Sequence, residues 1–102
     1  MIYEHRTYYI LPGKMAEHIE AFGTLIPVFA KHGAKMIGAW QTSIGNSNEF
    51  VYILGFENLS AQEKFWVNFR QDEKFKVYAA GGVRNEHVAN KILKPVAYSP
   101  LQ

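Results

Sequence analysis

Three side chains capable of acid–base or binding chemistry recur at every second position near the start of the chain: Glu4, Arg6 and Tyr8. In a β-strand this spacing places all three on one face. Arg6 could then bind a substrate acid, with Tyr8 as an acid or hydrogen-bond donor. The same row could instead be a structural ion pair within the sheet or across a dimer interface, and buried charged groups are more often of that kind.

Aromatic side chains form a second candidate group. They could line a cleft for a flat apolar ligand, although such residues more often belong to the core. A cofactor-free oxygenase needs only an apolar pocket, a polar anchor and a substrate that can activate oxygen itself. Trp40 and Arg6 could supply such a pocket and anchor, so both are candidate ligand-binding residues. We leave catalytic residues unassigned. The ligand-binding residues that we predict are Glu4, Arg6, Tyr8, Trp40, Tyr52 and Trp66.

The four histidines do not have the spacing of a metal site. His18 and His32 lie on one predicted helix, about 21 Å apart at its rise per residue. His5 and His87 lie on the first and last predicted strands, which we place apart in the sheet. We therefore predict no metal and no cofactor. Arg84, which follows two glycines, is interpreted as a solvated loop cation, with a mobile anion clamp as the alternative.

These candidates depend on six predicted elements, in the order strand, helix, strand, strand, helix, strand. Gly23 and Pro27 interrupt the first helical stripe and predict a kink or a split. Ser60 and Glu63 have the spacing of a capping box, and Asp72 is expected to cap a short continuation of the second helix. The elements span residues 2–11, 14–31, 35–44, 49–57, 60–80 and 87–93.

This order predicts an α+β, ferredoxin-like βαββαβ domain over residues 1–102, with a four-stranded antiparallel sheet and both helices on one face. The third strand is apolar on both sides, because Val51 and Ile53 oppose the stripe that contains Tyr52 and Leu54. Leaving such side chains in water would forgo several kcal/mol. We therefore expect a second copy of the chain to cover the bare face, so that the protein is a homodimer.

Composition excludes several classes of protein. The chain has 102 residues, is 48% hydrophobic and carries a net charge of only +2, so disorder and nucleic-acid binding are disfavoured. It has no cysteine and no apolar run of membrane-spanning length. We expect a cytoplasmic protein that neither binds nucleic acid nor inserts into a membrane.

Short motifs follow one another along nearly the whole chain: residues 3–8 (YEHRTY), 11–14 (LPGK), 32–33 (HG), 38–40 (GAW), Gly45, 48–49 (NE), 92–95 (ILKP) and 99–101 (SPL). In this order and spacing they resemble the NIPSNAP family, which belongs to the dimeric α/β barrel superfamily. The resemblance implies the same fold and a homodimer, and it brings no agreed reaction. Similar barrels in other families include monooxygenases and haem-degrading enzymes. The family commonly carries His and Trp where this chain has Tyr52 and Leu54.

Three functions follow as hypotheses. The first is a homodimeric barrel that binds a small aromatic or acidic molecule in a cleft of each subunit. The second is a non-enzymatic interaction or scaffold protein, and the third is a cofactor-independent monooxygenase. A solvent-lined cavity at Arg6 would favour the first, whereas a filled core with Arg6 locked against Glu4 would favour the second.

Overall fold

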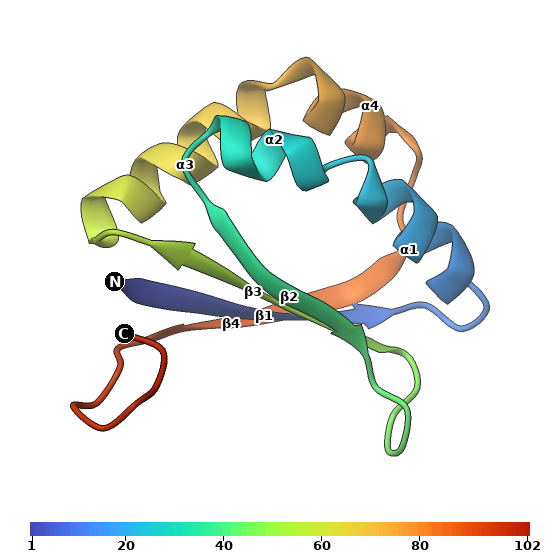
Figure 1. The fold of residues 1–102 in the computed structure, drawn as a ribbon. Coiled ribbons are helices and arrows are strands. Elements are labelled where there is room, and N and C mark those ends of the chain that lie inside the picture. The colour runs from blue at the N-terminus through green and yellow to red at the C-terminus, as the bar shows by residue number, and fades with distance from the viewer.

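The computed structural model describes residues 1–102, which form one four-stranded sheet with all helices on one of its faces (Figure 1). Strands run in the order β2-β3-β1-β4, and each neighbouring pair is antiparallel. This is the predicted α+β ferredoxin-like arrangement. The elements are β1 (Ile2–Ile10), α1 (Met15–Gly23), α2 (Ile26–Lys31), β2 (Lys35–Gln41), β3 (Glu49–Phe56), α3 (Leu59–Gln71), α4 (Glu73–Ala80) and β4 (Asn85–Leu93).

The first and last strands are neighbours, so their predicted separation was wrong. β4 pairs with β1 from Tyr3 to Ile10, with Arg6 opposite Asn90. His5 lies opposite Lys91, whereas His87 lies opposite Tyr9, so the two histidines remain at different levels of the sheet. No group of three metal-ligating side chains lies close enough together to hold an ion.

Proline explains why the first helical stripe divides into α1 and α2. Pro27 lies in the first turn of α2, where a missing N–H removes no helical hydrogen bond. Thr24 follows the end of α1, and its hydroxyl donates to the Ala21 carbonyl at 2.6 Å. The chain therefore starts a new helix at Ile26, with Pro27 as its second residue, instead of continuing as one kinked helix.

The cap of α3 differs from the prediction. Asn58, not Ser60, caps this helix, because its side-chain oxygen accepts a hydrogen bond from the Ala61 amide at 2.9 Å. The capping box at Ser60 and Glu63 is therefore wrong, and the helix begins one residue earlier. The expected cap at Asp72 is confirmed, since its carboxylate accepts from the Lys74 amide at 2.9 Å.

The register defines two faces of the sheet. We call the face that bears Glu4, Arg6 and Tyr8 the helix side, and the face that bears Tyr3 and Thr7 the open side. Residues paired across neighbouring strands share a face. The helix side of β3 therefore carries Phe50, Tyr52, Leu54 and Phe56, and that of β4 carries Val88, Asn90 and Ile92.

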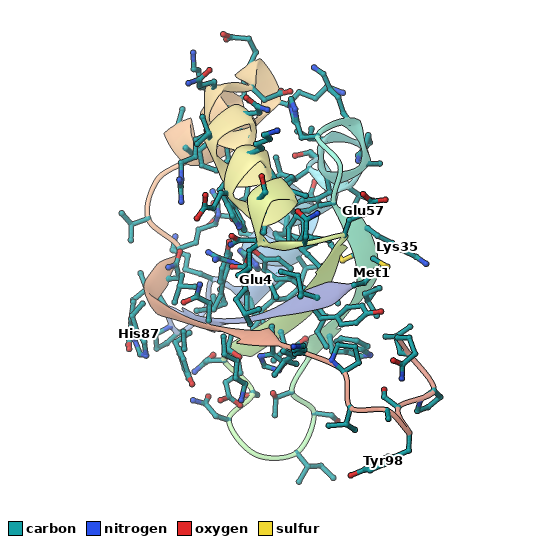
Figure 2. The ribbon with its side chains drawn as sticks, turned by 90° about the vertical axis from the view of Figure 1, so that its left-hand side faces the viewer. Met1, Glu4, Lys35, Glu57, His87 and Tyr98 are labelled. Atoms are coloured by element: carbon teal, nitrogen blue, oxygen red, sulfur yellow. The ribbon has the colours of Figure 1, made fainter.

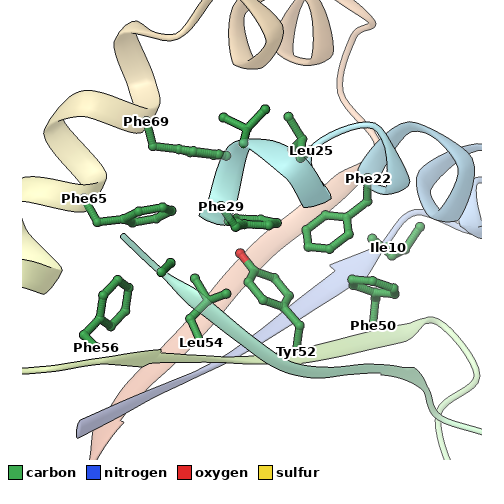
Figure 3. Packing of buried hydrophobic residues seen from close by; sticks show 12 residues of the cluster. Ile10, Phe22, Leu25, Phe29, Phe50, Tyr52, Leu54, Phe56, Phe65 and Phe69 are labelled. Carbon is green, nitrogen blue, oxygen red and sulfur yellow. The ribbon is translucent and has the colours of Figure 1, made fainter. Parts of the chain in front are cut away.

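The hydrophobic core lies on the helix side, between β3 and the helices (Figure 3). Phe29 of α2 stacks on Phe69 of α3 with ring centroids 5.1 Å apart, and Phe22 of α1 meets Tyr52 at 4.8 Å. Each fully buried ring of this kind contributes about 1.5–3 kcal/mol. Phe65 and Phe69 are therefore core residues and do not line an open cleft.

Two regions of the sheet are left uncovered by the helices. On the helix side, Val88 and Ile92 of β4 are 38% and 41% exposed. The open side carries no helix, and the tail after β4 projects from it, with Tyr98 at its outer bend (Figure 2). The tail returns to the sheet, because the Tyr3 hydroxyl donates to the Gln102 main-chain oxygen at 2.7 Å.

Candidate functional site

Glu4 is a fully buried carboxylate at the centre of a polar network on the helix side. Its Oε1 accepts from Gln62 Nε2 at 3.0 Å and from Trp66 Nε1 at 2.7 Å, both on α3. Its Oε2 accepts from Arg6 Nη1 at 2.8 Å and from Asn90 Nδ2 at 3.3 Å. Burial raises the pKa of this carboxyl, but the four donors outweigh it and leave the pKa below its ordinary value. Glu4 is therefore ionised.

Arg6 joins this carboxylate to a pair of phenols. Its Nε donates to the Tyr52 hydroxyl at 2.8 Å, and its guanidinium carbon lies 4.4 Å from the centroid of the Trp66 ring. Burial opposes the charge, but the neighbouring Tyr52, Tyr8 and Glu4 raise the pKa of Arg6. The side chain is 16% exposed. Its Nη2 has no hydrogen-bond partner and is not among the buried unpartnered atoms, so it reaches solvent.

The hydroxyls of Tyr8 and Tyr52 are 2.8 Å apart and share a hydrogen bond. Tyr52 comes from the middle of β3 and is completely buried. Burial therefore raises the pKa of Tyr52 well above its ordinary value. Both hydroxyl groups can act as hydrogen-bond donors, and the network runs continuously from Gln62 to Tyr8.

Five of the six predicted site residues meet in this network, and Trp40 does not. Trp40 pairs with Val51 of β3, which pairs with Thr7 of β1, so it belongs to the open side. Its side chain is 52% exposed and its ring lies over Gly38, where a Cβ would come within 2.5 Å of the indole. The prediction that Trp40 and Arg6 line one pocket was wrong, because they lie on opposite faces of the sheet.

Two buried residues outside the predicted ligand-binding set, His18 and Arg84, lie at the Tyr8 end of the network. His18 of α1 is fully buried, and its ring centroid is 5.5 Å from that of Tyr8. Neither ring nitrogen has a hydrogen-bond partner. Burial, together with the charge of Arg84, lowers the pKa of His18 to about 4, so its imidazole is neutral at pH 7.

Arg84 is buried, so its interpretation as a solvated loop cation was wrong. It is 6% exposed, and Nη2 donates to the Tyr78 carbonyl at 3.0 Å. Its guanidinium carbon lies 4.8 Å from the Tyr78 ring centroid. The Nε atom has no partner, and the side chain forms no ion pair. Neither helical nor strand periodicity could have indicated this burial, because Arg84 lies between two elements.

None of the four surface hollows is lined by Glu4, Arg6, Tyr8, Tyr52 or Trp66. The largest, of about 730 Å³, lies between α2 and the junction of α3 with α4. There Asp72 accepts from Lys31 Nζ at 3.0 Å and lies 2.8 Å from His32 Nε2. The polar network of β1 therefore has one exposed edge along β4 and no enclosed cavity.

Comparisons with known proteins agree with this architecture. The model of the NIPSNAP family matches residues 3–100. A NIPSNAP family protein of unknown function from Agrobacterium tumefaciens has a structure similar to this chain, with a TM-score of 0.91 and 27% identity over 100% of this chain and 94% of its own. An uncharacterised NIPSNAP domain protein from Burkholderia xenovorans gives a TM-score of 0.85 at 24% identity, over 98% of this chain and 99% of its own.

A more distant similarity concerns the fold alone. A putative antibiotic biosynthesis monooxygenase from Bordetella bronchiseptica has a TM-score of 0.71 at 20% identity, over 93% of this chain and 96% of its own. The comparison with curated proteins finds no match. No helix of the chain has the length and apolar character that crossing a membrane requires.

Proposed function

The chain belongs to the NIPSNAP family, and we propose that it acts as a homodimer in which each subunit binds a small, partly aromatic or acidic molecule on the helix side of its sheet. The ligand lies along β4, against Arg6, Tyr8 and Trp66. The observation that carries this proposal is the state of Arg6, whose Nη2 reaches solvent without a protein partner.

The neighbourhood of that nitrogen suits an amphipathic ligand. Trp66 offers its ring directly beneath the guanidinium, at 4.4 Å. Val88 and Ile92 flank Asn90 on β4 and leave apolar surface exposed where no helix covers the strand. A planar ligand here would remove this apolar surface from water, while its polar atoms accept from Arg6 and Asn90.

The open side supports the proposed homodimer. Trp40 is 52% and Leu93 is 39% exposed on this side, and Val51 and Ile53 lie between them in the sheet. The tail is bonded to Tyr3 and shares a hollow with Ile37 and Ile53 at this end of the sheet. A second copy of the sheet would bury these side chains through the same surface on both subunits, as a two-fold interface requires.

One observation favours the interaction platform as a second candidate function. Arg6 is bonded to Glu4 at 2.8 Å, and no hollow of the surface reaches it. In this alternative the polar network positions β1 against α3, and partners bind elsewhere. The two functions differ in what they predict for Arg6: a ligand contact in the first, and stability alone in the second.

Fluorescence of Trp66 can separate them. The chain has two tryptophans, so Trp40→Phe leaves Trp66 as the single indole reporter. This protein would be titrated with benzoate, salicylate, phenol and benzyl alcohol, and binding would appear as a saturable change at one ligand per subunit. Arg6→Gln should abolish the change or weaken the affinity about tenfold or more.

Lys64→Gln is the matched control, because it removes one cation from the exposed surface of α3, away from the site and from the open side. It should bind like the parent protein. If none of the probes alters Trp66 fluorescence while Arg6→Gln unfolds at lower urea concentration, ligand binding here is refuted and the platform function is favoured.

A further inference from the structure

Arg84 is a buried cation with no acidic partner. Only 6% of the residue is exposed, and its side chain makes one hydrogen bond, from Nη2 to the Tyr78 main-chain carbonyl. The Nε donor is buried without an acceptor. Removing a charge from water without pairing it is costly, so buried cations in proteins normally face a carboxylate or bind an anion. No carboxylate of this chain supplies that partner.

The charges on the helix side do not cancel. Glu4 and Arg6 form an ion pair, which leaves Arg84 as an uncompensated positive charge. His18 adds no charge of its own when its imidazole is neutral, but it brings two buried ring nitrogens without partners. The Tyr8 ring lies against that imidazole, with centroids 5.5 Å apart. Arg84 lies near the same end of the network, because its main-chain carbonyl accepts from the Leu11 amide at 2.8 Å, three residues after Tyr8 in the chain.

We propose that Arg84 and His18 form the anion-binding end of the ligand site, and that the ligand is a small organic monoanion, a carboxylate or a phenolate. This inference rests on the proposed function, because it assigns the charge of the same ligand. The anion accepts from Arg84 Nε, and a neutral imidazole supplies one N–H as a second donor. Neither residue lines a surface hollow, so the side chains around them must move apart to admit the ligand. The rest of the ligand extends past Tyr8 toward Arg6 and Trp66.

This assignment accounts for features that a purely structural role leaves unexplained. A water molecule could satisfy the Nε donor, but it would leave the guanidinium charge uncompensated. An anion satisfies the hydrogen bond and the charge together. A charge-assisted bond of this kind is also stronger than one between neutral groups, which favours an acid over a neutral analogue of the same shape.

The test compares acids with matched neutral compounds on the unmodified protein. Thermal unfolding would be followed in sodium acetate, sodium benzoate and benzyl alcohol, with sodium chloride holding the ionic strength constant. Histidine ring resonances in ¹⁵N-labelled protein would report contact with His18, which His18→Gln identifies. Acetate and benzoate should raise the unfolding temperature saturably and shift the His18 signals. The affinity for benzyl alcohol should be lower than that for benzoate by a factor of about ten or more.

Variants locate the anion. Arg84→Gln should weaken acetate and benzoate about tenfold or more, whereas Lys64→Gln, the same loss of charge on the exposed surface of α3, should leave both unchanged. Arg84→Lys keeps the charge and should bind acetate more tightly than Arg84→Gln does. If Arg84→Gln does not fold, Arg84→Lys replaces it, and it should bind acetate with a measurable affinity. The affinity for phenol, measured below and above the pKa of its hydroxyl, shows whether the site accepts a phenolate as well as a carboxylate.

The outcomes separate this inference from the proposed function. If benzoate and benzyl alcohol change Trp66 fluorescence equally, and Arg84→Gln binds both as the parent does, the site exists but the anionic end is refuted. If acetate shifts the His18 resonances, Arg84→Gln removes that shift and no aromatic probe changes Trp66 fluorescence, the anion site stands and the larger ligand site is refuted. If chloride raises the unfolding temperature as much as acetate and benzoate do, the site binds an adventitious ion only, and the inference is overturned.

Discussion

The indole nitrogen of Trp66 donates a 2.7 Å hydrogen bond to the carboxylate of Glu4, which joins α3 to the centre of β1. Glu4 is fully buried and also pairs with Arg6. One carboxylate thus links the helix layer and the sheet. An orphaned charge at this position would be costly, so the surrounding donors are as important for stability as the acid itself.

The Glu4–Trp66 bond should appear as an energetic coupling. Trp66→Phe keeps an aromatic ring but removes the donor, which should cost about 1–3 kcal/mol. In a double-mutant cycle with Glu4→Gln, the two changes should be non-additive by about 0.5–3 kcal/mol. Urea unfolding, followed by circular dichroism, measures all four proteins.

The same cycle with Trp40→Phe provides the control. Trp40 lies on the opposite face of the sheet from Glu4, so the coupling between them should be close to zero whatever Trp40 itself contributes. Equal coupling in the two cycles would contradict a specific role for the Trp66 donor.

His18 should make the fold less stable in mild acid. Its pKa is about 4 in the folded protein, against an ordinary value of about 6.5 in the unfolded chain. Between these values the unfolded state binds more protons, so the free energy of unfolding falls as pH decreases from about 6.5 to 4, by no more than about 3 kcal/mol. His18→Phe should flatten this part of the pH profile.

His87→Gln is the comparison for His18, because His87 is exposed where it stacks on Tyr9. The pH profile of this variant should keep the slope of the parent. A slope between pH 4 and 6.5 that survives in His18→Phe would show that other groups cause it.

The observed cap of α3 can be tested with two similar substitutions. Asn58→Ala removes the acceptor for the Ala61 amide and should lower the free energy of unfolding by about 1 kcal/mol. Ser60→Ala, two residues later, should change it by less than about 0.5 kcal/mol. Chemical denaturation of both variants decides; a larger loss for Ser60→Ala would restore the capping box.

The proposed dimer makes a prediction about the open side. Analytical ultracentrifugation at micromolar concentration should give a mass of two subunits for the parent protein. Ile53→Lys places a charge in the middle of the proposed interface and should yield monomers. Val67→Lys places the same charge on α3, where the residue is already 54% exposed, and should leave the dimer intact. A monomeric parent would refute the proposal.

The strand pattern predicted much of this architecture because alternation is a local property. The two-residue spacing from Glu4 to Tyr8 was enough to place these side chains on one face, where the structure confirms them. Tyr52 and Trp66 were also predicted as ligand-binding residues, and the structure brings both to the same polar network. Their hydrogen bonds to Arg6 and Glu4 depend on how β3 and α3 pack on β1, which no local pattern encodes.

Each wrong prediction has a physical cause that local sequence patterns do not reveal. The face of Trp40 depends on the register of β2, which shifts between Met36 and Gly38. Asn58 competes with Ser60 for the same helix start, and either residue type can cap a helix. Arg84 lies in a connection whose burial is decided by α1 and α4 together. The monooxygenase alternative stays a prediction, to be checked by oxygen uptake with polycyclic phenols.

Asp72 has a consequence for how the helix layer moves. The same carboxylate caps α4, contacts His32 at 2.8 Å and accepts from Lys31 at the end of α2. These bonds hold the pKa of Asp72 far below its usual range. The helices on either side of this anchor should therefore open together, so that amide protons of α2 and α4 exchange with deuterium as one cooperative unit rather than separately.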